Sequence, residues 1–217
     1  MKIYKELEQQ TPKWYAVREW TLTWTKMSGA VGGDKAQLTQ TYTLLAEKYV
    51  NDEDLKAWEI IERGNELEDV AKLNYEELTG RKVEEVGFIT KTGNDNHGLS
   101  PDWIILDEDC GLYTGAVEIK CPMWKNYVKY LLEDKIPDEY KWQVTNYFIV
   151  MEDLKWLDFI IYNPDVSSEI PSLHVIHVTR EDMQKDIDKA EKKLEGFISN
   201  WEELEDRLLI KDAELCE

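Results

Sequence analysis

Cysteine is scarce in this chain of 217 residues, which contains only Cys110, Cys121 and Cys216, all widely spaced. An odd number of distant cysteines fits reduced thiols better than a disulfide framework or a zinc site. Three cysteines also cannot fill a four-cysteine iron–sulfur cluster. The cysteines therefore predict neither a disulfide-stabilised secreted scaffold nor a cysteine-held metal.

Long apolar runs are lacking as well. The sequence has no stretch of about 18 apolar residues, which is what a membrane-spanning helix requires. Residues 1–8 lack the apolar centre of a signal peptide. We therefore expect no membrane partner and a cytoplasmic location.

Positive charge is also in short supply, because 26 Lys and Arg residues face 45 Asp and Glu residues, for a net charge of −19. Contacts to phosphate need basic residues and supply most non-specific affinity for nucleic acids, so the composition argues against generic nucleic-acid binding. Two interpretations stay open. The basic residues line a DNA path while acidic residues lie on outer faces, or the protein is a non-catalytic, acidic DNA mimic or scaffold that binds a DNA-binding partner.

The length suits one substantial hydrophobic core, so we expect a single domain over residues 1–217. It would have a helical N-terminal part (1–80), a sheet core (81–180) and a C-terminal helix (181–210). The spacing of apolar residues predicts helices at residues 11–18, 39–50, 55–78, 125–132, 139–151 and 180–210. It predicts strands at 83–89, 103–106, 116–119, 157–162 and 173–178, and a turn or short helix start at 27–33.

Three charged side chains fall at the ends of two predicted strands. Asp102 opens the strand at 103–106, and the turn-rich residues 107–115 join it as a hairpin to the strand that carries Glu118 and Lys120. The strand period of two points Glu118 and Lys120 to one face, while Ile119 packs into the core and offers its carbonyl oxygen. Two carboxylates and a carbonyl suit a hard cation such as Mg²⁺. A Glu-x-Lys triplet also arises by chance on a solvated strand.

Two short motifs accompany these charges, Ser-Pro-Asp at residues 100–102 and Glu-Ile-Lys-Cys-Pro at residues 118–122. Together they resemble the PD-(D/E)XK nuclease superfamily, and more closely the lambda-type exonucleases and the YqaJ-type viral recombinases. The resemblance implies an α/β fold with a restriction-endonuclease-like core, in which helices flank a mixed β-sheet and a long helix ends the chain. It also implies a metal-dependent deoxyribonuclease with two Mg²⁺ ions per active site, which Mn²⁺ could replace.

The resemblance gives each charged residue a role. Asp102, Glu118 and the carbonyl of Ile119 would hold metal, and Lys120 would orient the attacking water or help to lower its pKa. Gln143 matches the family's helix glutamine behind the active site, where it would contact the water, Lys120 or the scissile phosphate. Relatives often carry a second glutamine two residues later, where this chain has Thr145.

Glu68 is the candidate for a further metal ligand. It follows Gly64 by four residues, so both lie on one face of a helix, as in the family's motif of Gly with a Glu four residues on. The glycine would let the DNA backbone approach while the glutamate reaches the metal. A solvated glutamate is the alternative, and Glu66 is a near neighbour with the same chemistry.

A second group of residues resembles the pocket for a terminal 5′-phosphate in lambda-type exonucleases. The Trp-x-x-x-Arg motif ends at Arg18, and Ser28 and Ser100 complete the set, although the loop before Ser28 is longer than in relatives. A bidentate guanidinium and short hydroxyl donors suit phosphate. A surface arginine and two capping serines are the alternative. Ile61 matches a wedge that splits the terminal base pair, or is ordinary core.

The histidines receive no metal-binding role. His174 and His177 point to opposite faces of a predicted strand, so they cannot share an ion. His97 precedes a predicted turn at Gly98 near the active site, where it could touch substrate.

The resemblance therefore predicts a 5′-to-3′ exonuclease that degrades linear double-stranded DNA and leaves 3′ single-stranded tails for phage-type recombination. It implies a ring-shaped homotrimer, a single-strand annealing protein as partner, and a bacterial or phage-infected host cell. A PD-(D/E)XK endonuclease on the same fold is the first alternative, and it would cut closed circles. The second is the acidic DNA mimic or scaffold, which would not hydrolyse DNA.

Overall fold

The computed structural model describes residues 1–18, 21–49 and 58–215, with the side chains of 46–49, 58–66, 124 and 210–215 excepted. Its helices are α1 (Pro12–Arg18), α2 (Trp24–Ala30), α3 (Asp34–Tyr49), α4 (Trp58–Thr79), α5 (Trp124–Glu133), α6 (Lys141–Val150) and α7 (Arg180–Leu215). Its strands are β1 (Lys2–Tyr4), β2 (Phe88–Lys91), β3 (Asn94–Leu99), β4 (Trp103–Asp107), β5 (Leu112–Lys120), β6 (Trp156–Tyr162) and β7 (Leu173–Thr179).

The strands form two sheets. The larger sheet has the order β4-β5-β6-β7, and the smaller one is β1-β2-β3. Every described pair is antiparallel except β5 and β6, which are parallel because the chain crosses over between them through α5 and α6. The carboxyl ends of β5 and β6 therefore lie at the same end of the larger sheet.

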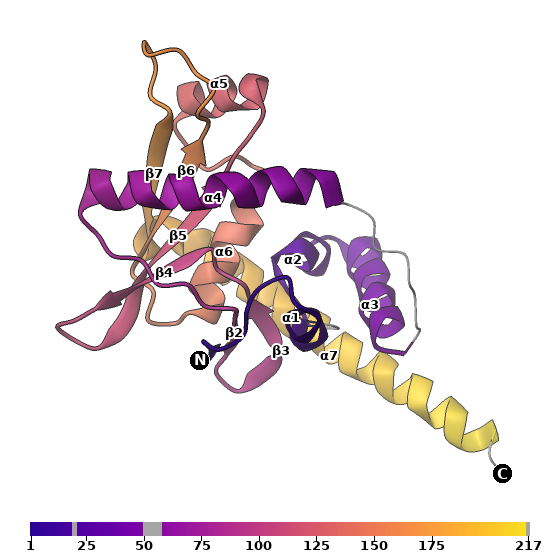
Figure 1. Ribbon diagram of the computed structural model, residues 1–217. Helices are drawn as coiled ribbons and strands as arrows, with labels where there is room; N and C mark the ends of the chain where they lie inside the picture. The colour runs from indigo at the N-terminus through magenta and orange to yellow at the C-terminus, as the bar shows by residue number, and fades with distance from the viewer. Residues whose placement is uncertain (19–20, 50–57, 216–217) are drawn as a thin grey trace.

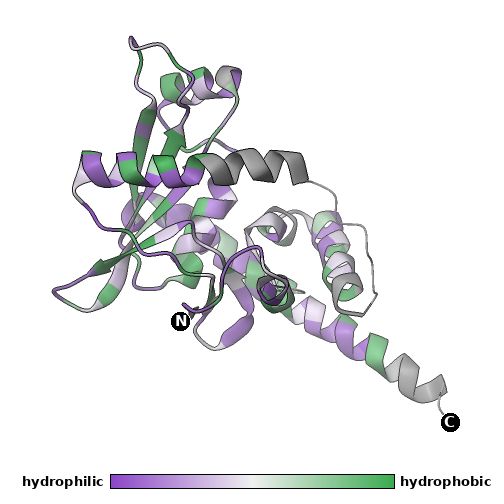
Figure 2. Cartoon of the chain, viewed as in Figure 1, coloured by the Kyte–Doolittle hydropathy of each residue, from purple (hydrophilic) through white to green (hydrophobic). Residues whose placement is uncertain are grey.

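Helices cover both faces of the larger sheet, with α4 across one face and α6 and α7 on the other (Figure 1). Alternate residues of β5 supply the two faces: Val117 packs with Tyr75 of α4, whereas Ala116 belongs to the larger core with Val144 of α6. Glu118 follows Val117, so it points to the α6 side. Burial on both faces explains why hydrophobic residues follow one another along β6 (Figure 2).

The C-terminal helix α7 packs along the α6 side. Its buried residues follow a helical period: Met183, Ile187, Ala190, Leu194, Phe197 and Trp201. Arg180, its first residue, donates hydrogen bonds to the carbonyls of Phe148, Met151 and Leu154, at and just beyond the end of α6, at 2.8–2.9 Å. The last turns of α7 project away from the sheets (Figure 1). No described helix is long and apolar enough to cross a membrane.

Several predicted elements are confirmed, among them the hairpin, the strands at 157–162 and 173–178, and the long final helix. The predicted first strand at 83–89 was largely wrong, because β2 begins only at Phe88 and Glu84 forms just an isolated bridge with Ile104. The strands β1 and β3 were not predicted. The N-terminal part, predicted as helical, therefore also contains a strand.

Candidate active site

Glu118 lies near the carboxyl end of β5 and is 1% exposed. Three side chains donate hydrogen bonds to its carboxylate. Lys120 and Gln143 donate to Oε1, and the hydroxyl of Tyr147 donates to Oε2. The strand period places Lys120 beside Glu118, and one turn of α6 separates Gln143 from Tyr147.

Asp102 precedes β4 and meets the end of β5 from the adjacent strand. Its Oδ2 accepts the backbone N–H of Ile119 at 2.7 Å, and its own backbone N–H donates to the Tyr147 hydroxyl at 3.2 Å. A residue in a strand directs its N–H and C=O to the same neighbour, so the Ile119 carbonyl also faces the Asp102 side. The predicted convergence of Asp102, Glu118 and Ile119 is thus present in the structure.

The charges at this site do not cancel. Burial, followed by the charge of Glu118, raises the pKa of Asp102 well above its usual range. Burial opposes the charge of Lys120, but Glu118 and Asp102 outweigh it and raise the pKa of the ammonium. Lys120 therefore stays a cation and acts through its charge and position. Its Nζ lies 5.3 Å from the ring centre of Tyr140 and 5.9 Å from that of Trp24.

Gln143 is 3% exposed and has one atom without a partner. Its Nε2 binds Glu118, but its Oε1 is buried and accepts no hydrogen bond from the described residues. A buried acceptor of this kind calls for a donor such as water. Thr145, at the position of the second family glutamine, instead donates to the Lys141 carbonyl of its own helix at 2.8 Å.

Glu68 comes from α4 and approaches the same charges. Its pKa is raised mainly by burial, with Lys120 lowering it and Glu118 raising it. Glu68 and Asp102 both line a cavity of about 390 Å³ under the N-terminal segment 5–10. Glu68 makes no hydrogen bond to Asp102 or Glu118 in the described chain.

The donor set has the chemistry of a metal site but not a closed arrangement of ligands. Within the described ranges, no three His, Cys, Asp or Glu side chains are arranged as a ready metal cluster, so Glu68 does not complete one with Asp102 and Glu118. The chemistry nevertheless fits a hard cation. Asp102, Glu118 and Glu68 face one ammonium, a carbonyl lies at the same edge, and Gln143 keeps an unpaired oxygen. Asp102, Glu118 and the Ile119 carbonyl are the groups that could hold it.

Arg18 and Ser100 meet in a second polar site. Arg18 Nη1 donates to Ser100 Oγ at 3.3 Å, and its guanidinium lies 3.8 Å from the ring centre of Trp14. Trp14 Nε1 donates to Gly87 O at 2.8 Å and contacts Ser100 Oγ at 3.1 Å. Burial lowers the pKa of Arg18 to about 10, and no described carboxylate forms an ion pair with it. A half-buried cation with no carboxylate paired to it among the described residues is suited to an incoming anion.

Two further predicted site residues are Ser28, of the phosphate pocket, and Ile61, the wedge. Ser28 is exposed on α2, borders a hollow next to the start of α3, and forms no hydrogen bond with Arg18 or Ser100. Ile61 falls within α4, but its side chain lies outside the described residues, so the wedge stays a prediction.

Two features of the site were not anticipated. Tyr147 has the same apolar surroundings as its helix neighbours, so nothing in the pattern marked its hydroxyl as a partner of Glu118. The expectation that His97 touches substrate was wrong. His97 is 2% exposed on β3, its Nε2 contacts Asn146 Oδ1 at 2.7 Å, and burial lowers its pKa to about 4.

The motifs of this site lie within the part of the chain that matches a known family. Residues 13–152, more than half of the chain, match the model of the YqaJ-like viral recombinase domain. The chain belongs to this family. The match includes Arg18, Asp102, Glu118 and Gln143. A comparison with curated proteins found no match.

Solved structures resemble this YqaJ-family chain over nearly its whole length. An alkaline exonuclease from Laribacter hongkongensis is 25% identical, with a TM-score of 0.80 over 94% of this chain and 100% of the other. The same enzyme in complex with dAMP gives 24% identity and 0.80 over the same shares. A phage related exonuclease from Haemophilus somnus 129PT gives 13% and 0.59 over 87% and 96%. The last two show the fold alone. The predicted α/β fold is thereby confirmed.

Proposed function

We propose that the chain is a metal-dependent deoxyribonuclease of the lambda-exonuclease type, which degrades linear double-stranded DNA from 5′ to 3′ and leaves 3′ tails. The observation that carries the proposal is the convergence of Asp102, Glu118, Lys120 and Gln143 at the end of β5. Family membership and the likeness to an alkaline exonuclease support it.

Each residue of the site would have its own role in phosphodiester hydrolysis. Bound Mg²⁺ would supply Lewis-acid activation and neutralise charge that develops on the phosphate. Lys120, held as a cation, attracts the scissile phosphate and orients the attacking water. The unpaired Oε1 of Gln143 accepts a hydrogen bond from that water. Glu68 borders the same cavity and would contribute to a second ion.

The polarity of digestion would come from Arg18. Its guanidinium is held against Trp14 and Ser100, and its charge is unpaired within the described chain, so it suits a terminal 5′-phosphate. An end seated there would present the next phosphodiester to Lys120 and Glu118. Ser28 belongs to this proposal only by the motif.

The wider assignments rest on the resemblance. We include in the proposal a single nuclease domain over residues 1–217, a homotrimer, a single-strand annealing protein as partner, and action in the cytoplasm of a bacterial or phage-infected cell. The net charge of −19 makes ring assembly around DNA the most demanding of these, since the few basic residues must then face the duplex.

The first test is a digestion assay with Mg²⁺ on linear duplex DNA, with and without 5′-phosphates, beside a closed circle. We expect phosphate-stimulated loss of linear DNA, no loss of the circle, and no activity for Lys120→Ala. Arg18→Gln should lower the preference for 5′-phosphate by about tenfold or more, because charge-assisted hydrogen bonds contribute about 1.5–3 kcal/mol.

A matched control is available in Arg81→Gln. Arg81 also stacks on a tryptophan, 4.3 Å from the ring centre of Trp156, but it pairs with Asp158 on β6. It should keep the wild-type preference for 5′-phosphate. Cutting of the circle would replace the proposal with an endonuclease, and absence of any Lys120-dependent hydrolysis would favour the acidic DNA mimic.

A further inference from the structure

The Tyr147 hydroxyl links Asp102, at the start of β4, to Glu118, near the end of β5. It donates to Glu118 Oε2 and accepts the backbone N–H of Asp102 at 3.2 Å. The side chain is 1% exposed and comes from α6, one turn beyond Gln143. The phenol thus ties the side chain of one candidate ligand to the backbone of the other.

The hydrogen bonds of Glu118 leave one acceptor position open. A carboxylate offers about four acceptor positions, two on each oxygen. Oε1 receives two donors, Lys120 Nζ and Gln143 Nε2, whereas Oε2 receives only the Tyr147 hydroxyl. No other described group donates to Glu118. The remaining position therefore lies on Oε2, and Tyr147 determines where it points.

We propose that Tyr147 is a positioning residue that makes Glu118 bind the divalent cation through Oε2 alone, in register with Asp102. The inference rests on the proposed function. It goes beyond it in naming the ligating oxygen and the residue that fixes it. Removal of the hydroxyl would leave Oε2 of Glu118 without its described donor and the part-buried Asp102 N–H without its acceptor.

The test is the affinity of the metal-free full chain for Mn²⁺, measured by the electron paramagnetic resonance signal of unbound Mn²⁺. Tyr147→Phe should weaken Mn²⁺ binding by about tenfold or more, as is usual when a group behind a metal ligand is lost. Its nuclease rate should recover toward wild type as Mn²⁺ is raised to saturation. A purely structural role would not produce such recovery.

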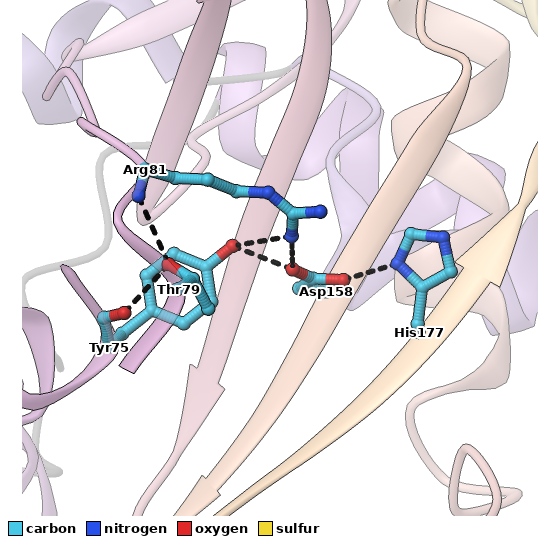
Figure 3. A network of polar contacts seen from close by, with 5 residues as sticks. All are labelled: Tyr75, Thr79, Arg81, Asp158 and His177. Carbon is cyan, nitrogen blue, oxygen red and sulfur yellow. Dashed lines mark hydrogen bonds and ion pairs between the residues drawn. The ribbon is translucent and has the colours of Figure 1, made fainter. Parts of the chain in front are cut away.

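Tyr75→Phe is the matched control. Tyr75 is also a buried tyrosine whose hydroxyl donates to a buried carboxylate, that of Asp158 at 2.6 Å, on the α4 side of the sheet (Figure 3). It should lower the free energy of unfolding about as much as Tyr147→Phe while leaving Mn²⁺ affinity unchanged. Equal Mn²⁺ affinity in Tyr147→Phe and wild type, or equal weakening in both variants, would overturn the inference.

Failure of the proposed function would give a different result from failure of the Tyr147 inference. If Glu118→Gln binds Mn²⁺ as tightly as wild type, the metal site itself is misplaced, whatever Tyr147→Phe does. If Tyr147→Phe does not fold, infrared difference spectra of the wild-type protein with and without Mg²⁺ still show whether Glu118 binds the cation through one oxygen or two. Coordination through one oxygen separates the two carboxylate stretching bands, and this signal must vanish in Glu118→Gln. A spectrum of two-oxygen coordination would overturn the inference.

Discussion

Two buried carboxylates lie on adjacent strands of the same sheet and have opposite surroundings. Glu118 on β5 and Asp158 on β6 are each 1% exposed, and each receives three side-chain contacts. Asp158 pairs across the sheet with Val117, so it lies on the α4 face, whereas Glu118 lies on the α6 face. They have the same chemistry and burial, yet they differ in charge balance.

Asp158 is balanced by its partners. Tyr75 donates at 2.6 Å, and Arg81 and His177 contact it at 2.5 Å (Figure 3). The side chains of Arg81 and His177 are 41% and 47% exposed, so one buried anion is joined to groups that stay in water. This network fastens the end of α4 to β6 and β7.

Glu118 has three hydrogen-bond donors, but the charges around it do not sum to zero. Its single cation, Lys120, also faces Asp102, and Glu68 adds to the negative charge. A buried charge without compensation costs folding free energy unless something else is bound. An excess of negative charge, rather than burial or the number of hydrogen bonds, therefore distinguishes the surroundings of Glu118 from those of Asp158.

The largest expected effect is on catalysis. Glu118→Gln should lower the rate of DNA hydrolysis by about 1000-fold or more, because loss of several kcal/mol of metal-dependent stabilisation has that effect. Asp158→Asn should leave the rate per folded molecule close to wild type. A digestion assay on linear duplex, with circular dichroism as the check on folding, measures both. Equal losses in the two variants would remove the distinction.

The order of effects should reverse for stability. Asp158→Asn should lower the free energy of unfolding by about 2 kcal/mol, less than for a fully buried ion pair because Arg81 and His177 regain water. Glu118→Gln should lower it less in the metal-free protein, since Asp102 can then ionise and balance Lys120. Urea denaturation of both variants measures the difference. A larger loss in Glu118→Gln would contradict the comparison.

The smallest expected effect is stabilisation by Mg²⁺. At a tenfold excess over its dissociation constant, Mg²⁺ should add about 1.4 kcal/mol to the free energy of unfolding of wild type and of Asp158→Asn, but not of Glu118→Gln. The pKa of Asp102 is raised, so metal-free folded protein holds a proton that the unfolded chain loses first, and its stability falls as pH rises through that window. The gain from Mg²⁺ should therefore grow with pH, and this growth should be weaker in Asp102→Asn.

The strands next to Asp102 and Glu118 were predicted well from the sequence because their signals are local. The apolar runs around Asp102 and Glu118 are bounded by turn residues, and the motif fixes which charges face inward. The strand β3 was missed because its sequence, Asn-Asp-Asn-His-Gly-Leu, is typical of a turn, and only its pairing with β2 makes it a strand. The strand β1 has just three residues, too few for a visible alternation.

The parts of the site that escaped prediction depend on contacts between distant segments. Tyr147 meets Asp102 across 45 positions of sequence and Glu118 across 29, and no periodicity encodes such a meeting. Ser28 shows the opposite case, since a motif with an altered spacing pointed to a hydroxyl that forms no described hydrogen bond with Arg18, and its role stays a prediction.

The hydrogen bonds of Arg180 imply an order in which the candidate active site is assembled during synthesis. The carbonyls they cap belong to α6 and the turn after it, and α6 carries Gln143 and Tyr147. During synthesis, a nascent chain that has emerged only as far as α6 lacks this cap and also lacks β6, the strand beside Glu118. The surroundings of Glu118 seen in the structure are therefore complete only after the start of α7 has left the ribosome, so we expect a truncated translation product to carry the motifs without an assembled site.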